Sequence, residues 1–279
     1  MVLDEMTTTE ALMPFFLPNP GTTLEKLRQW QGLDLHGVID WWGLHRQEAE
    51  GWHTDINRLV VGAFRKHPEA EDHTLLTGVA GKLYGSQAVA SALAAWDDLK
   101  RALDGWAILS WHQRMNWPVM MWQDSFYHRD LTVPPPRAEP PPLPGSVGVQ
   151  DDCPLEVWQA LGSNLDGVIA GYTSALAHYE QAVAVAETGR GRQECGFHRD
   201  SVELGRCFHV LGRHTVEAQL ARREARPVPA GVLQAAIGNL VRIIELSDRL
   251  GTFDYRRDWY FDAIAAMRRE VRRRGEIPV

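Results

Sequence analysis

The sequence predicts an all-α protein, and three features of its 279 residues support this fold class. Apolar residues recur every three or four positions in nearly every periodic segment, which is the spacing of one helix face. Alternating runs of useful strand length are missing from the sequence, and so are βαβ patterns and internal repeats. We therefore expect a single domain over residues 1–279, folded as a helical bundle.

In the N-terminal half, helices are expected wherever the apolar spacing persists between turn signals. Thr22 and Thr23 are candidate caps for the first helix. The polar segment from His67 to His73 contains a proline and predicts a loop. Pro118 should interrupt the last of these helices. The predicted helices cover residues 22–30, 34–64, 74–103 and 106–130.

A proline-rich segment separates the two halves of the chain. Residues 134–144 hold seven prolines, and a run of this kind favours an extended polyproline II conformation. We expect an exposed, semi-rigid connector over residues 133–152 that acts as a spacer.

The C-terminal half contains the clearest helical pattern, which begins at Trp158 and ends near Glu187. Its large apolar residues fall on one face and predict a buried stripe. The segment 188–196 is rich in glycine and arginine and predicts a loop. Further helices are expected over residues 197–223, 232–250 and 253–273.

Composition argues against several classes of protein. The formal net charge is −7, whereas sequence-independent nucleic-acid binding needs a basic face. Three cysteines without a CxxC pair argue against a disulfide framework and predict a cytoplasmic protein. The N-terminus lacks a signal-peptide pattern, and no apolar run approaches the roughly 18 residues that span a bilayer. Exposed tryptophans on the N-terminal helices would favour a homodimer.

The chain contains 11 tryptophans and 11 histidines. A buried indole N–H needs a hydrogen-bond partner, so a tryptophan is costly to place without a purpose. The tryptophans have two interpretations, which are an aromatic-rich core and a pocket for a flat aromatic ligand or cofactor.

One histidine lies on a stripe of small residues. Gly171, Ala175, His178, Ala182 and Ala186 are spaced by three or four positions and share a second face of the same helix. A flat shelf beside an imidazole suits a porphyrin whose iron the imidazole binds. The same small residues also permit two helices to pack closely, in which case His178 is an ordinary core histidine.

A helical histidine, a glycine-bearing segment and a further helix, in this order, resemble the tryptophan 2,3-dioxygenase superfamily of histidyl-ligated heme enzymes. The segment Asp72-His73-Thr74 is similar to that superfamily's distal-histidine segment. The segment WHQRMNW, from Trp111 to Trp117, is most like the heme-dependent L-tyrosine hydroxylases. Where the dioxygenases carry GTGGSS, this chain has TGRGRQECG, which disfavours the dioxygenase reaction.

The resemblance implies a bundle that encloses heme b and a substrate pocket. It implies His178 as the iron ligand, with the small residues Gly171, Ala175 and Ala182 beside the macrocycle. It also implies that His73 is the distal residue, able to move a proton of the bound oxidant.

The resemblance further implies an aromatic amino acid as substrate and peroxide or dioxygen as oxidant. Arg114, or alternatively Arg129, would bind the substrate carboxylate, and Trp117 would pack on the substrate. His112 is a second candidate for the distal role. The implied reaction is 3-hydroxylation of L-tyrosine with hydrogen peroxide. The alternatives are dioxygenase-like opening of an indole ring and a non-enzymatic helical binding or scaffold protein.

A second cluster contains cysteines and histidines that are candidate zinc ligands, at Cys195, His198, Cys207, His209 and His214. On one helix, His198 and His209 would lie about 16 Å apart at 1.5 Å per residue, which is too far to share one ion. We therefore favour an ordinary helix with an apolar core stripe here.

Overall fold

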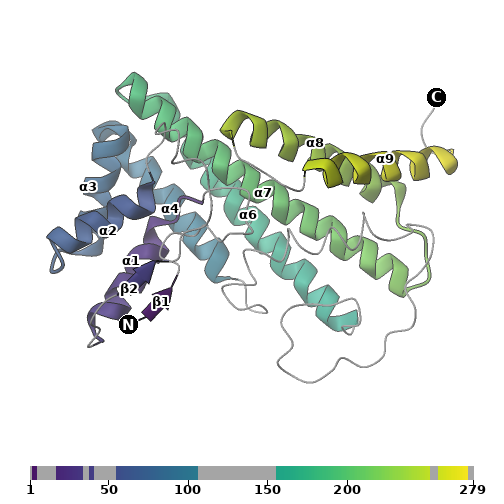
Figure 1. Ribbon diagram of the computed structural model, residues 1–279, viewed down its shortest axis with the longest axis horizontal. Helices are drawn as coiled ribbons and strands as arrows, with labels where there is room; N and C mark the ends of the chain where they lie inside the picture. Colours follow the sequence, from purple (N-terminus) through teal and green to yellow (C-terminus); the bar gives the residue numbers. More distant parts are fainter. Residues whose placement is uncertain are drawn as a thin grey trace. The chain divides into compact units, whose positions relative to one another are not determined.

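Helices dominate the computed structural model (Figure 1), which describes residues 2–4, 17–33, 38–40, 55–105, 155–251 and 257–275. The prediction of an all-α fold is confirmed, apart from two short strands, β1 (Val2–Asp4) and β2 (Val38–Asp40), that pair in parallel. The helices are α1 (Pro20–Gln31), α2 (Ile56–Lys66), α3 (Asp72–Tyr84), the 3-10 helix η2 (Ser86–Ala88), α4 (Val89–Asp104), α6 (Leu155–Val185), α7 (Gly189–Arg223), α8 (Ala230–Leu250) and α9 (Arg257–Arg273).

The chain forms two compact units, each assembled from three separate segments. Unit 1 comprises Met1–Asp104, Ala170–Gly205 and Leu246–Phe253, and unit 2 comprises Gly105–Ile169, Arg206–Glu245 and Asp254–Val279. Helices α6, α7 and α8 each begin in one unit and end in the other. The helices predicted over 106–130 and the connector predicted over 133–152 lie outside the described residues.

The N-terminal helix boundaries differ from the prediction at several places. Helix α1 begins at Pro20, so Thr22 and Thr23 lie inside it and do not cap it. Helix α3 begins at Asp72, two residues before its predicted start at Thr74.

Within the helix expected over 34–64, Val38–Asp40 form strand β2. Helix α2 begins at Ile56, where the Asp55 side chain caps it by accepting hydrogen bonds from the backbone N–H groups of Asn57 and Arg58, at 2.9 and 3.2 Å. The helix expected over 74–103 is interrupted at Gly85, whose φ of 95° suits glycine and ends α3.

The prediction of a loop over residues 188–196 was wrong, because α7 already begins at Gly189. Thr188 Oγ1 accepts a hydrogen bond of 2.9 Å from the backbone N–H of Gly191 and so caps the first turn. A Cβ at Gly191 would lie 2.9 Å from the carbonyl oxygen of Tyr84. Glycine therefore permits a close approach between the end of α3 and the start of α7, and this packing outweighs its low helix propensity.

The apolar stripe predicted along α6 is largely confirmed. Leu176 and Val183 are only half-buried, whereas the other six positions form the core of their units. The buried members are Trp158, Leu161, Leu165, Val168, Tyr172 and Tyr179.

Helix α8 has a buried face at three- and four-residue spacing, with Leu233, Ala236, Leu240 and Ile243. By length and composition alone, it is the one described helix that could cross a membrane, a test that core helices of soluble proteins also pass.

Candidate functional site

His178 lies on α6 next to a buried carboxylate of α4. Its Nε2 is 3.6 Å from Oδ2 of Asp98, and its side chain is 33% exposed. The Asp98 carboxylate also accepts hydrogen bonds from Ser174 Oγ and from the Arg101 guanidinium. Asp98 is therefore the acidic neighbour of this imidazole, at ion-pair distance but beyond hydrogen-bond distance.

The small residues beside His178 pack against protein. A Cβ added at Gly171 would lie 2.5 Å from the Cβ of Ala102 and 3.3 Å from its Cα, so α4 and α6 touch there. Ala175 and Ala182 are fully buried. Of the two interpretations of the stripe, close helix packing is the one that this geometry supports.

The other end of the stripe is also closed. The Glu187 carboxylate accepts hydrogen bonds from Ser86 Oγ, at 2.6 Å, and from the backbone N–H of Gln87, at 3.2 Å. These bonds lower the pKa of Glu187. Glu187, which follows α6, thus binds two residues that precede α4. The stripe on α6 is therefore in contact with α4, or with the residues just before it, at both of its ends.

A heme on this stripe does not fit the packing of the described residues. The macrocycle needs a flat gap beside the imidazole, and Ala102 takes up that space at Gly171. A heme bound by His178 would have to approach from the exposed side of the imidazole instead. Ligation by His178 therefore stays a prediction, and the small residues have a different use.

Of the predicted distal and substrate-binding residues, the described part of the chain includes His73. His73 is exposed in the first turn of α3, and among the described residues no hydrogen bond or ion pair joins it to His178. Arg114 and Trp117 lie outside the described residues, as do the alternatives His112 and Arg129.

A buried aromatic cluster links α3, α4, α6 and α7. Trp96 Nε1 donates a hydrogen bond of 2.9 Å to the Tyr179 hydroxyl, and the Tyr84 hydroxyl shares one of 2.6 Å with His198 Nδ1. Burial raises the pKa of Tyr84 and of Tyr179 well above the ordinary value, so both hydroxyls stay protonated. At Trp96 the aromatic-core interpretation therefore holds, because the indole N–H has its partner inside the fold.

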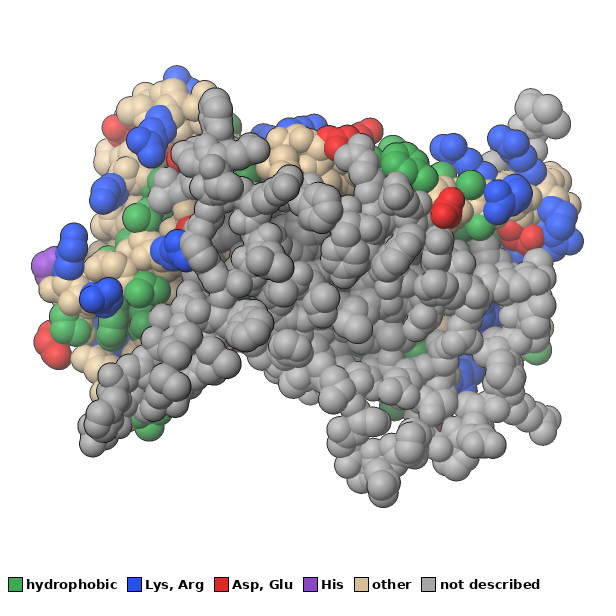
Figure 2. Space-filling view, in the orientation of Figure 1, with side chains coloured by type: hydrophobic (Ala, Val, Ile, Leu, Met, Phe, Trp, Pro, Cys, Tyr) green, Lys and Arg blue, Asp and Glu red, His purple; other side chains and the backbone are tan. Residues whose placement is uncertain are grey.

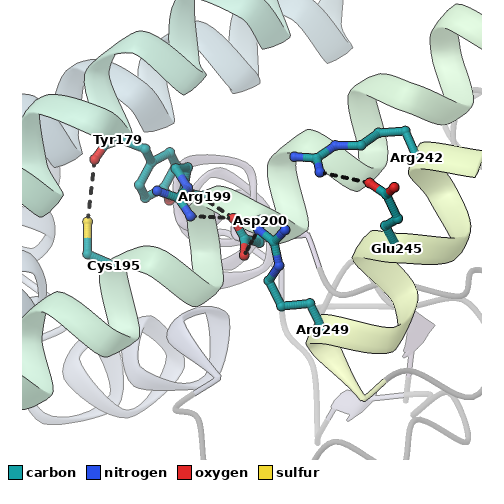
Figure 3. Close-up of polar contacts among 7 residues, drawn as sticks. All are labelled: Tyr179, Cys195, Arg199, Asp200, Arg242, Glu245 and Arg249. Carbon is teal, nitrogen blue, oxygen red and sulfur yellow. Dashed lines mark hydrogen bonds and ion pairs between the residues drawn. The ribbon is translucent and has the colours of Figure 1, made fainter. Parts of the chain in front are cut away.

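The cysteine and histidine cluster of α7 does not form a metal centre within the described residues. His198 is engaged by Tyr84, and the Cys195 thiol donates to the Tyr179 carbonyl oxygen at 3.8 Å (Figure 3). Burial raises the pKa of Cys195 to about 12, which keeps the thiol protonated.

Asp200 is one of two buried carboxylates in the first half of α7, together with Glu194. Its carboxylate accepts hydrogen bonds from Arg199, at 2.9 and 2.6 Å, and from Arg249 of α8, at 3.1 Å (Figure 3). The two guanidiniums balance one buried carboxylate, so this cluster ties α7 to the end of α8 within unit 1.

Helices α2 and α3 form the sides of a groove with a volume of about 580 Å³. Its described lining contains one arginine, two lysines and one histidine, His67, and lacks carboxylates. Figure 2 shows Lys and Arg side chains with hydrophobic ones between them over these two helices. The apolar wall consists of Leu59, Ala63, Leu75 and Val79, and the basic residues are Arg58, Lys66 and Lys82.

Helix α1 and the segment before it hold the two walls in place. Arg28 donates to Asp72 at 2.8 Å and stacks 4.9 Å from the ring centroid of Phe64. Buried Asn57 donates through Nδ2 to the Leu17 carbonyl oxygen, at 3.0 Å. The groove is therefore formed between helices that are anchored from behind.

The sequence analysis missed this groove, although the sequence holds a signal for it. A Cβ at Gly62 or Gly78 would meet no atom within 4 Å, whereas an interior glycine costs a helix roughly 0.5–1 kcal/mol relative to alanine. Packing does not require these glycines, and their effect is to leave the groove open. Each helix contributes a row at four-residue spacing, with Arg58, Gly62 and Lys66 from α2 and Thr74, Gly78 and Lys82 from α3.

Comparisons of the chain with known protein families, with curated proteins and with solved structures found no match.

Proposed function

We propose that the chain is a non-enzymatic helical binding protein that takes a small organic ligand into the groove between α2 and α3. The groove itself carries the proposal. Its volume of about 580 Å³ falls within the roughly 300–1,000 Å³ of small-molecule sites, and it combines apolar walls with a few polar groups, as such sites do.

The surroundings of His178 support the same proposal. The small residues that suggested a cofactor site in the sequence instead allow α4 and α6 to pack closely. At Gly171 there is no room for a side chain, because a Cβ would lie 2.5 Å from the Cβ of Ala102. The main sequence argument for a cofactor thus has an explanation in helix packing, which leaves the groove as the better-supported site.

Replacing Gly62 with leucine should abolish ligand binding, because the new side chain fills the groove while improving helix propensity. Binding of medium-length aliphatic acids, amides and alcohols can be measured by saturation-transfer NMR. Gly238→Leu is the matched control, since Gly238 is also an exposed helix glycine at which an added Cβ would meet no atom within 4 Å. Loss of binding in both variants, or in neither, would contradict the assignment of the groove.

Heme-dependent oxygenation of an aromatic amino acid is the second candidate function. The observation that favours it is the Asp98 carboxylate 3.6 Å from His178 Nε2, because a carboxylate partner of this kind is typical of metal-binding histidines. When bound, a heme would supply the redox chemistry, and His178 would hold it from the exposed side of the imidazole, with Asp98 beside the ring.

Titration with hemin tests the second candidate directly. Heme bound through His178 should give a Soret band that is lost in His178→Ala and retained in His73→Ala. A well-folded wild-type protein that gives no Soret band would eliminate heme ligation and the oxygenase activity with it.

A further inference from the structure

We propose that the ligand of the α2/α3 groove is an anion on an aliphatic body, a medium-length carboxylate in its simplest form, whose charged group lies beside Lys82. This inference rests on the proposed function and names the ligand class of the same site. Three features carry it: the charge of the lining, the length of the apolar wall and the placement of the nearby acidic residues.

The charge of the groove is one-sided. Arg58, Lys66 and Lys82 are exposed and contribute three positive charges to the lining, and none of the described lining residues is acidic. A cationic or neutral ligand would leave this charge uncompensated, whereas a carboxylate would offset it. The ligand is therefore expected to be an anion.

The length of the apolar wall sets the length of the aliphatic part of the ligand. Each row spans eight residue steps, as from Arg58 to Lys66, which is about 12 Å at 1.5 Å per step. The wall between the basic residues is aliphatic, with Leu75 and Val79 buried and Leu59 half-buried. An aliphatic chain of medium length fits this wall, since burying each CH₂ is worth about 0.8 kcal/mol.

The nearby acidic residues distinguish the two ends of the groove. Glu69 and Glu71 lie within five positions of Lys66, in the segment that connects the two helices. Lys82 lies in the last turn of α3, about 15 Å along the helix from Asp72. Glu187 also lies near the end of α3 that carries Lys82, but its carboxylate is already engaged by Ser86 Oγ and the backbone N–H of Gln87. We therefore place the carboxylate of the ligand at Lys82.

Arg58 is the secondary contact for the anion. Its Nε is already 3.6 Å from Asp55 Oδ2, so part of its charge is compensated. Lys82, in contrast, has no ion-pair partner within the described residues. We therefore assign the main charge contact to the Lys82 ammonium group.

Isothermal titration with octanoate, octanamide and octylammonium tests the inference, because the three probes share one body and differ in charge. At low ionic strength, octanoate should bind wild-type protein more tightly than octanamide, and octylammonium should bind weakest. Lys82→Glu should weaken octanoate about tenfold and leave octanamide unchanged within twofold. Lys66→Glu is the matched control and should have the smaller effect on octanoate.

The outcomes separate this inference from the proposed function. If octanamide binds as tightly as octanoate and both are lost in Gly62→Leu, the groove binds ligands but the anion is wrong. A larger loss of octanoate binding in Lys66→Glu than in Lys82→Glu would overturn the placement of the carboxylate. Absence of binding by all three probes would overturn the inference, and failure of the wider NMR set as well would overturn the proposed function.

Discussion

Replacing Gly171 with alanine is expected to lower the free energy of unfolding by about 1–3 kcal/mol, the usual cost of overpacking a close contact. The added Cβ would lie 2.5 Å from the Cβ of Ala102 and 3.4 Å from the Asp98 carbonyl oxygen. Neither neighbour is the end of a flexible side chain, so α4 and α6 must separate. Urea denaturation followed by circular dichroism measures the loss.

Gly167→Ala is the matched control for this experiment. Gly167 also lies within α6, and a Cβ there would meet no atom within 4 Å. Alanine should therefore stabilise the protein by about 0.5–1 kcal/mol through its better helix propensity. If Gly171→Ala behaves like Gly167→Ala, the two helices do not touch at Gly171, and a gap beside His178 becomes available again.

Replacing Trp96 with alanine is expected to lower the free energy of unfolding by about 3–5 kcal/mol. The indole is 1% exposed, donates to the Tyr179 hydroxyl at 2.9 Å and packs at a centroid distance of 6.2 Å from the Tyr84 ring. The substitution removes a large buried volume and leaves that hydroxyl without one of its partners. Because domains are stable by only about 5–15 kcal/mol, the urea midpoint should fall markedly.

Trp96→Phe separates the two contributions at this position. Phenylalanine keeps most of the buried apolar surface and loses the hydrogen bond, so the loss should be nearer the roughly 1–3 kcal/mol of an unsatisfied buried polar group. Equal losses for Trp96→Phe and Trp96→Ala would contradict the assignment of Trp96 to the core, because they would mean that its volume contributes nothing.

The helices of the C-terminal half could be predicted from the sequence because their apolar periodicity is long and regular. The stripe from Trp158 to Tyr179 shows this, since most of its members are buried where the 3.6-residue period places them. In the N-terminal half, the period continued through Gly85, and the interruption there depends on a backbone φ of 95°. The spacing of apolar residues does not report backbone dihedral angles, so it could not predict this interruption.

The start of α7 illustrates a second limit. The segment from Thr188 to Gly196 contains three glycines and resembles a turn in isolation. It is helical because Gly191 fits against the Tyr84 carbonyl oxygen, which lies more than 100 positions earlier in the chain. The tertiary contact at Gly191 therefore adds to the local cap at Thr188, and apolar periodicity records neither.

The candidate site was harder to predict than the fold for a related reason. The spacing of Gly171, Ala175 and His178 placed them correctly on one face of α6, but spacing cannot say whether a cofactor or a helix covers that face. The identity of the partner at Gly171 decides between them, and that partner, Ala102, belongs to another helix. Likewise, the glycines inside α2 and α3, Gly62 and Gly78, have an explanation only once the structure shows that both line the same groove.

Three of the five unit boundaries fall inside the helices α6, α7 and α8. Cutting the gene at any of these boundaries would sever a continuous run of main-chain hydrogen bonds and expose new helix ends without caps. Dissection by truncation is therefore unsuited to this molecule. The separate contributions of its halves are better resolved by point substitutions in the intact polypeptide.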